Sequence, residues 1–160
     1  MNHIIISGLI GSGKTTITKL FKEFNYSIFS ADIMVKKLIK TNTKIRSLLI
    51  KVFGRKILYK NNISFTKLRH ELIKSEINKK KIENIIHPEF FRLINKNIKQ
   101  KKHIKSVIEL PLIETHRKLL KPYKIIFIDC TFKNRLNRAK KNKKFNDKEF
   151  NRINFLQKSR

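Results

Sequence analysis

Residues 8–15 have the sequence Gly-Leu-Ile-Gly-Ser-Gly-Lys-Thr and match the pattern G-x-x-x-x-G-K-[ST] in full. Residues 3–6, His-Ile-Ile-Ile, precede this stretch and predict a short buried strand. Residues 15–24 follow with apolar side chains at helical spacing. A strand, a glycine loop and a helix in this order are typical of a phosphate-binding loop, where backbone N–H groups and the helix dipole favour an anion. The alternative, a glycine-rich turn with a chance lysine, is disfavoured because motif and context agree.

The distribution of glycine supports this interpretation. The chain has four glycines, and three of them, Gly8, Gly11 and Gly13, fall within six residues. A chain that otherwise uses little glycine needs it where the backbone approaches another group closely or takes a positive φ angle. In such a loop we expect the Lys14 ammonium to contact the β- and γ-phosphates and the Thr15 hydroxyl to bind Mg²⁺.

Length and composition predict one globular domain. The chain has 160 residues, of which 40% are hydrophobic and 31% charged. No apolar run approaches the ~18 residues that a membrane span needs, and the N-terminal stretch lacks the features of a secretory signal. The one cysteine, Cys130, excludes a disulfide framework and a multi-thiolate zinc site. We therefore expect a cytoplasmic protein without a membrane partner.

The net charge is extreme: 39 Lys and Arg against 11 Asp and Glu give +28. One interpretation is a nucleic-acid or anionic-lipid partner. The other is compositional bias, because the chain contains 30 Lys, 26 Ile and 15 Asn, which share AT-rich codons. The lysines are dispersed along the chain, and dispersed charge is usually a solvated surface. We favour the bias and expect no specific nucleic-acid partner, although polyanionic substrates would still be attracted.

Strand-like and helical segments alternate along the rest of the chain, which predicts an α/β fold with a parallel sheet. The expected further strands are residues 26–30, 105–110 and 124–129, the last two buried. The expected helices are residues 33–53 with a break near 41–43, 67–75 capped by Thr66, 79–86 ending at His87-Pro88, about 89–101, 133–141 and 147–158. Ligands of such sheets bind at the carboxyl ends of the strands.

Several polar side chains fall at those strand ends or after them. Asp32 follows the second strand, and its position alone fits equally a general base and a carboxylate at the start of a helix. Asp129 and Glu109 are rivals for a Walker-B role, and ordinary pairing with lysine explains either equally well. His87 fits either a ligand contact or, more simply, the end of a helix. Arg138 on the basic helix fits either closure over bound phosphates or exposure to solvent.

Short motifs along the whole chain resemble those of the dephospho-CoA kinase family. They are Ser7–Thr16, Ser30-Ala31-Asp32-Ile33-Met34, Leu68-Arg69-His70-Glu71-Leu72, His87-Pro88, Pro111-Leu112-Ile113-Glu114, Asp129-Cys130-Thr131 and Arg152-Ile153 with Gln157 and Arg160. The glycine loop alone is generic, whereas its combination with Ser30-Ala31-Asp32 and His87-Pro88 is much more specific.

The chain departs from the family pattern at several points. Leu9 replaces a loop glycine, and Ser30 replaces the first of two aspartates. Glu114 comes one residue early, and Asn142-Lys143 replaces an Arg-Asp pair. The pattern continues beyond the equivalent of Arg160 with a strand and a final helix. We therefore expect a C-terminally shortened member that lacks part of the adenine pocket and one sheet edge.

The resemblance implies a P-loop three-layer α/β/α fold within one domain, 1–160. Its core would be residues 1–32 and 103–130, with a helical acceptor-binding insert over about 33–102. A small helical lid would follow over about 131–160.

The resemblance also implies transfer of the ATP γ-phosphoryl group to the ribose 3′-hydroxyl of dephospho-CoA, the last step of coenzyme A synthesis. ATP and Mg²⁺ would be the cofactors, and the chain would act as a monomer. Asp32 and Lys14 would be catalytic, Thr15 would bind the metal, and Arg69 and His87 would bind the acceptor. The implied ATP-binding residues are Gly8, Gly11, Ser12, Gly13, Lys14, Thr15, Thr16 and the lid residue Arg138.

Three alternatives share some of these features. Another P-loop small-molecule kinase, such as a nucleoside monophosphate kinase, would share the loop without the later motifs. A GTPase needs an N-K-x-D motif, and the Asn-Lys pairs at 78–79 and 95–96 lack the aspartate. A basic nucleic-acid-binding protein would rest on charge alone, with salt-sensitive, sequence-independent association.

Overall fold

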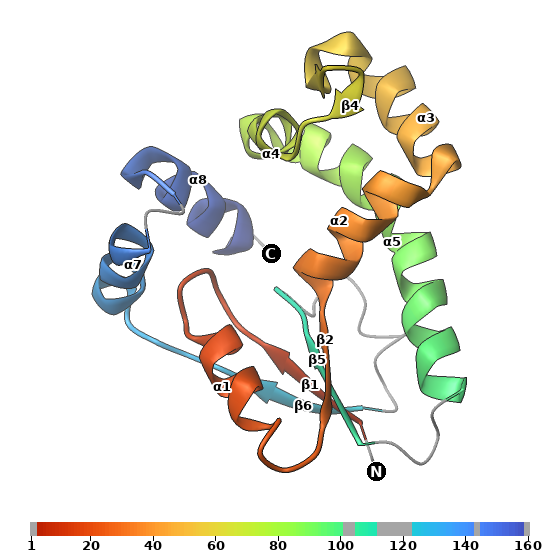
Figure 1. Ribbon diagram of the computed structural model, residues 1–160. Helices are drawn as coiled ribbons and strands as arrows, with labels where there is room; N and C mark the ends of the chain where they lie inside the picture. The colour runs from red at the N-terminus through yellow and green to blue at the C-terminus, as the bar shows by residue number, and fades with distance from the viewer. Residues whose placement is uncertain (1–2, 101–104, 112–122, 143–144, 159–160) are drawn as a thin grey trace. The chain divides into compact units, whose positions relative to one another are not determined.

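The computed structural model of the protein describes residues 3–100, 105–111, 123–142 and 145–158 (Figure 1). These residues form two compact units. The first combines Met1–Ala31 with Lys102–Arg160, and the second is the continuous stretch Asp32–Lys101.

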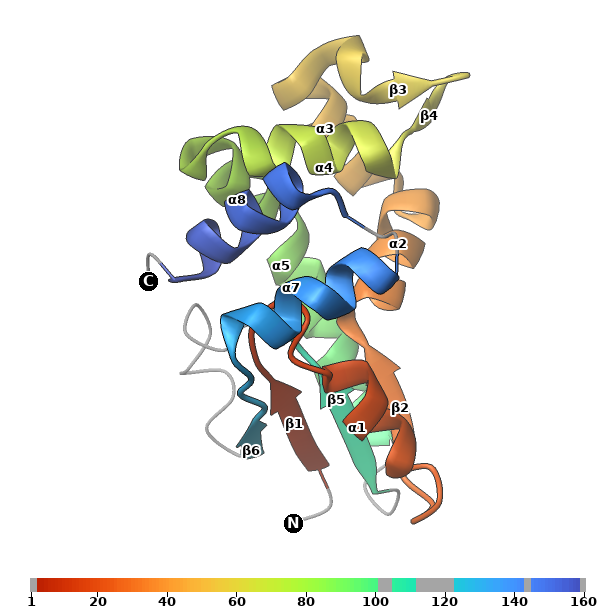
Figure 2. The ribbon, with the colours of Figure 1, turned by 90° about the vertical axis from the view of Figure 1, so that its left-hand side faces the viewer.

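A parallel four-stranded sheet forms the centre of the first unit, in the order β2-β5-β1-β6 (Figure 2). The strands are β1 (His3–Ser7), β2 (Ser27–Ser30), β5 (Ser106–Glu109) and β6 (Lys124–Phe127). Ile5 of β1 pairs with Ile108 on one side and Ile125 on the other. The apolar run of residues 3–7 is therefore an inner strand, with Ile5 and Ile6 fully buried. The predicted α/β fold with a parallel sheet is confirmed.

Strand β6 corrects one expectation. Residues 124–129 were expected to form a buried strand, yet β6 ends at Phe127 and all four of its residues are exposed. Ile125 and Phe127 keep 45% and 54% of their surface accessible. The reason is the position of β6: among the described residues it pairs with β1 alone, at the edge of the sheet. An apolar run cannot by itself distinguish a central strand from an edge strand.

The described part of the first unit contains the helices α1 (Lys14–Leu20), α7 (Phe132–Lys141) and α8 (Asp147–Lys158). The Thr131 hydroxyl caps α7 by accepting from Asn134 N. A capping box starts α8, because Asn146 Oδ1 accepts from Glu149 N and Glu149 Oε2 accepts from Asn146 N. The predicted helix over 147–158 is thereby confirmed.

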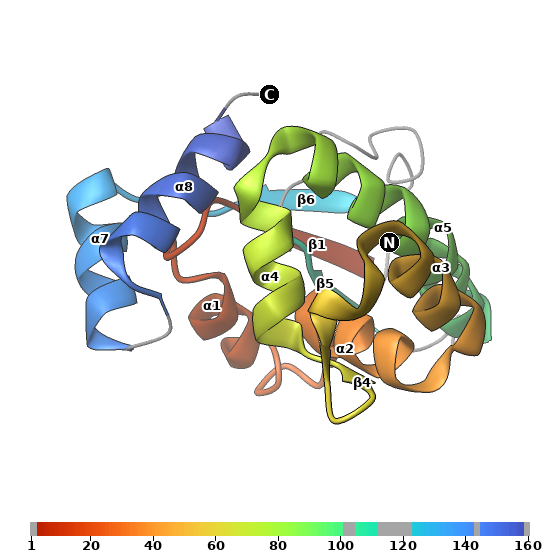
Figure 3. The ribbon, with the colours of Figure 1, turned by 90° about the horizontal axis from the view of Figure 1, so that it is seen from above.

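The second unit is helical. It contains α2 (Ala31–Thr41), α3 (Thr43–Phe53), the 3₁₀ turn η1 (Gly54–Ile57), the hairpin β3 (Leu58–Tyr59) and β4 (Asn62–Ile63), α4 (Phe65–Lys74) and α5 (Glu76–Gln100). Both α3 and α4 pack against α5 (Figure 3). The buried side chains include Ile45, Leu49, Phe53, Ile57, Leu68, Ile82 and Ile86.

Two helix boundaries in this unit differ from expectation. The cap of α4 is Ser64, whose hydroxyl accepts from Lys67 N, and not Thr66, which lies inside the helix. Both are hydroxyl residues just before an apolar run, so the sequence pattern does not separate them.

The helix expected over 79–86 does not end before Pro88, because α5 continues through the proline. Proline in a helix interior costs about 3 kcal/mol. Beyond it, however, α5 buries Phe90, Phe91 and Ile94. Each such side chain contributes roughly 1.5–3 kcal/mol on burial, so packing outweighs the local penalty.

The buried carboxylate Glu71 predicts acid sensitivity of this unit. Its Oε2 lies 2.9 Å from Lys56 Nζ and accepts from Asn78 Nδ2 at 3.1 Å. The hydrogen bond with Lys56 is the main cause that holds the pKa of Glu71 below its usual range. A group whose pKa is lower in the folded chain than in the unfolded chain stabilises the fold above the unfolded pKa. This stabilisation is lost as pH falls through the folded pKa.

Glu71→Gln should therefore be less stable than wild type at pH 7, and the difference in free energy of unfolding should narrow toward pH 3. Urea unfolding at several pH values tests this, with the exposed Glu23→Gln as control. A gap that stays constant with pH would contradict it.

Candidate active site

The glycine loop joins β1 to α1, and other segments of the first unit pack tightly against it. Gly11 has φ +76°, and a Cβ added there would lie 2.7 Å from the carbonyl oxygen of Arg135. A Cβ on Gly8 would overlap the carbonyl oxygen of Ile128. Close approach of the backbone thus explains why this glycine-poor chain concentrates glycine here.

Two polar side chains of the loop, those of Lys14 and Ser12, differ in their hydrogen bonds. Lys14 begins α1, and its Nζ donates to the carbonyl oxygens of Gly8 and Leu9, both at 2.9 Å. The ammonium therefore lies over the loop itself. Ser12 is only 3% exposed, and its hydroxyl makes no hydrogen bond to the described residues. A buried hydroxyl without a partner can donate to a ligand oxygen at no cost in internal bonds.

The carboxylate that reaches the loop is Glu109. Its Oε1 accepts a 2.8 Å hydrogen bond from Thr15 Oγ1. The sheet explains this, because Glu109 ends β5 directly beside β1, in register with Ile6. The rival carboxylate, Asp129, instead accepts from the N–H of its neighbour Cys130 through Oδ1.

Helices α7 and α8 also contact the loop. Arg138 Nη1 donates to Ser12 O at 2.9 Å, so this predicted residue lies at the loop. Two further contacts were not expected from the sequence. Arg135 Nη1 donates to Ile10 O at 3.3 Å, and Ile10 N donates to Gln157 Oε1 at 2.8 Å. Only the family motif around Gln157 hinted at its importance, and no pattern pointed to Arg135.

The remaining predicted residues lie in the second unit. Asp32 is an exposed residue in the first turn of α2, two positions after Ser30. Arg69 is half-buried on α4, and His87 on α5 packs edge-on against Phe91, with ring centroids 6.0 Å apart. Of the motif positions quoted above, Leu112, Ile113, Glu114, Lys143 and Arg160 lie outside the described residues.

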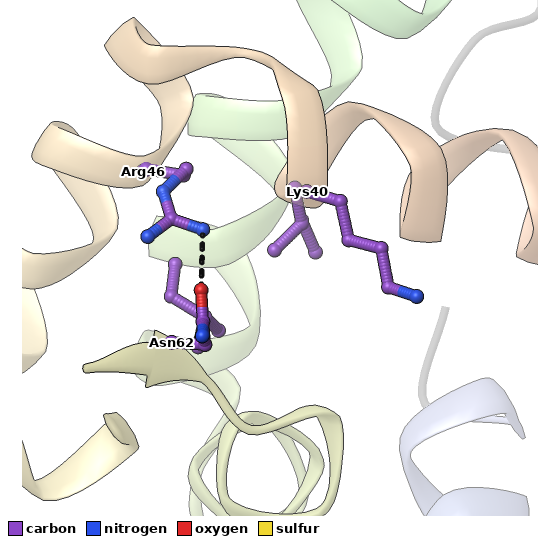
Figure 4. A pocket seen from close by; sticks show the side chains of 5 residues that line it. Lys40, Arg46 and Asn62 are labelled. Carbon is purple, nitrogen blue, oxygen red and sulfur yellow. Dashed lines mark hydrogen bonds between the residues drawn. The ribbon is translucent and has the colours of Figure 1, made fainter. Parts of the chain in front are cut away.

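The second unit also contains a pocket of about 440 Å³ (Figure 4). Its lining residues are Ile39, Lys40, Arg46, Asn62 and Ile63. Arg46 Nη1 donates to Asn62 Oδ1 at 3.4 Å across it. None of the residues predicted from the sequence lines this pocket.

A phosphate-binding loop between an inner strand of a parallel sheet and a helix, with a carboxylate at the end of the neighbouring strand, is the arrangement of P-loop nucleotide-binding proteins. A sequence model of the family described as dephospho-CoA kinase matches residues 3–160. The chain therefore belongs to the dephospho-CoA kinase family, whose reaction is the final step of coenzyme A synthesis. As a member it is a kinase, and its family implies the use of ATP.

Individual relatives agree with this assignment. The dephospho-CoA kinase of Buchnera aphidicola from Schizaphis graminum is 31% identical over 151 residues, covering 94% of this chain and 72% of the relative. That of Buchnera aphidicola from Acyrthosiphon pisum is 29% identical over 162 residues, covering 100% and 75%.

Solved structures show the same fold. A Thermus thermophilus protein, TT1252, has a TM-score of 0.78 at 19% identity, covering 97% of this chain and 79% of its own. The Campylobacter jejuni dephospho-CoA kinase has a TM-score of 0.58 at 21% identity, covering 98% and 79%. Among the residues that the structure describes, no helix combines the length and apolar character needed to cross a membrane.

Proposed function

We propose that this chain transfers the γ-phosphoryl group of ATP to the ribose 3′-hydroxyl of dephospho-CoA, giving coenzyme A and ADP. The observation that carries the proposal is the family match over residues 3–160, within which the phosphate-binding loop is complete. A nucleoside monophosphate kinase or a nucleic-acid-binding protein is disfavoured by that membership.

A coupled ADP-release assay tests the reaction. Dephospho-CoA should stimulate ADP release well above the rate with ATP alone, while AMP and CMP should not. Stimulation by a nucleoside monophosphate and not by dephospho-CoA would favour the alternative kinase.

The triphosphate would bind to Gly11–Thr16, with Gly8 allowing the loop to turn. Lys14 would stabilise charge on the transferred group, and its position over the loop supports this role. The Ser12 hydroxyl has no hydrogen-bond partner among the described residues, which supports its donation to a phosphate oxygen. Arg138 would bind ATP as part of a lid over about 131–160, which its contact with Ser12 O supports.

Thr15 and Glu109 fit the binding of Mg²⁺. Magnesium takes oxygen ligands, commonly one or two from the protein together with substrate phosphates. The Thr15 hydroxyl and the Glu109 carboxylate supply oxygens that already touch at 2.8 Å. Within the described ranges, no group of three or more His, Cys, Asp or Glu could hold a metal without substrate. Bound Mg²⁺ would neutralise charge on the phosphate oxygens.

This assignment predicts the effect of Glu109→Gln. Because an amide is a weaker partner for Mg²⁺ than a carboxylate, the variant should need more Mg²⁺, by about 10-fold or more for half-maximal rate. The rate should recover in part at saturating Mg²⁺. Asp129→Asn is the matched control and should behave like wild type. If Asp129→Asn raised the Mg²⁺ requirement instead, the metal-binding carboxylate would be Asp129.

Asp32, Arg69 and His87 would bind or orient the acceptor. The Asp32 carboxylate would orient or deprotonate the attacking hydroxyl. Arg69 and His87 would bind dephospho-CoA within a helical insert over about 33–102. Their location on α4 and α5, two helices that pack together, supports a shared role.

A further inference from the structure

Arg135 of α7 is a buried cation that contacts the phosphate-binding loop. We propose that Arg135 is a positioning residue of the nucleotide site, which fixes the loop backbone at Ile10 and supplies a buried positive charge for the triphosphate. The inference rests on the proposed function, because it concerns the same loop. Neither the motifs of the sequence nor membership of the family gives Arg135 a role.

The first argument is the geometry of the guanidinium group. Arg135 is 2% exposed, although it is an arginine in a very basic helix. Its Nε donates to Cys130 O at 3.0 Å, and its Nη1 donates to Asn154 Oδ1 at 2.7 Å and to Ile10 O at 3.3 Å. One rigid, planar group thus connects the segment after β6, helix α8 and the loop.

The second argument is that both polar groups of Ile10 are occupied. Its carbonyl accepts from Arg135, and its N–H donates to Gln157. Asn154 and Gln157 are three positions apart on α8 and so share one face of that helix. By holding Asn154, Arg135 keeps α8 where Gln157 reaches the loop. The next residue, Gly11, lies against the Arg135 backbone, so the loop cannot shift toward α7.

The positive charge of the buried Arg135 guanidinium points to the same role. Within the described ranges, the hydrogen bonds of Arg135 go to neutral oxygens only. A buried guanidinium without a carboxylate is costly, because neutral oxygens offset only part of the lost hydration. A triphosphate at Gly11–Thr16 would supply the missing negative charge. The unbalanced charge therefore favours a polyanionic ligand at the loop, and ligand binding in turn stabilises the folded chain.

The test compares Arg135→Met and Arg135→Lys with Lys133→Gln, which removes an exposed charge from the same helix. ATP binding by calorimetry should weaken about 10- to 100-fold in Arg135→Met, the range expected when a hydrogen bond from a charged group is lost. KM for ATP should rise in parallel, while KM for dephospho-CoA should change by less than about twofold. Arg135→Lys keeps the charge without the fork and should recover part of the affinity. Lys133→Gln should match wild type.

Hydrogen exchange separates positioning from general stability. In Arg135→Met, amides of residues 8–13 should exchange faster without nucleotide, while those of β1 keep their protection. A variant that melts earlier yet binds ATP like wild type would show that Arg135 is only structural and would overturn the proposal. If Arg135→Met does not fold, Asn154→Leu removes one of its anchors and should still weaken ATP binding several-fold. Unchanged affinity in Asn154→Leu would then overturn it. Failure of wild type to bind ATP would instead refute the proposed function.

Discussion

Replacing Lys14 with alanine is expected to reduce turnover by at least about 10³-fold while leaving the fold intact. The ammonium is proposed to stabilise negative charge that develops on the transferred phosphoryl group, and alanine cannot do so. The fold should survive because Lys14 is only half-buried, and the carbonyls of Gly8 and Leu9 that it contacts can bind water instead. ADP release with dephospho-CoA measures turnover, and circular dichroism measures folding.

Lys19→Ala is the matched control for that experiment. Lys19 is an exposed lysine on the same helix, so the variant removes one charge without touching the loop. It should retain nearly full turnover. Normal turnover in Lys14→Ala, measured beside this control, would remove the kinase proposal.

Asp32→Asn is expected to lower kcat by roughly 10²-fold or more, with ATP affinity little changed. The asparagine side chain keeps the size of aspartate but cannot accept a proton from the attacking hydroxyl. The position supports this role, because Asp32 follows Ser30 by two residues and Ser30 pairs with Glu109 at the end of the sheet. Ser30 occupies the position of the first of the two aspartates in the family pattern. Position 30 therefore offers no carboxylate that could substitute for Asp32.

Steady-state rates at varied concentrations of ATP, Mg²⁺ and dephospho-CoA distinguish a role of Asp32 at the acceptor from a role at the metal beside Glu109. A loss confined to kcat in Asp32→Asn assigns it to the acceptor hydroxyl. A loss confined to ATP or Mg²⁺ affinity would instead assign Asp32 to the metal site together with Glu109. Glu23→Gln, which alters an exposed carboxylate, serves as the control for charge alone.

Local signals predicted much of the fold. The loop motif and the apolar run before it each act over a few residues, so the sequence displays them directly. The errors arose where distant packing decides the outcome. Helix α5 passes Pro88 because of side chains buried beyond it, and β6 is exposed because it lies at the edge of the sheet.

In the candidate site, too, local motifs were predictive, whereas contacts between distant segments could not be predicted. Lys14, Thr15 and Arg138 were predicted from motif or resemblance, and all three contact or form part of the loop region. The choice between Glu109 and Asp129 stayed open until the strand order was known, because it depends on which strand lies beside β1. The contact of Arg135 with Ile10 joins residues 125 positions apart, and no local pattern carries such information.

That contact has a consequence for the order in which the site is made. The ribosome synthesises the phosphate-binding loop well before the partners of Ile10 on α7 and α8. The bond from Ile10 to Gln157 spans 147 positions. A nascent chain that stops before α7 would carry the full loop motif with neither polar group of Ile10 anchored. If these contacts position the loop as proposed, tight nucleotide binding requires α7 and α8, which are synthesised long after the loop itself.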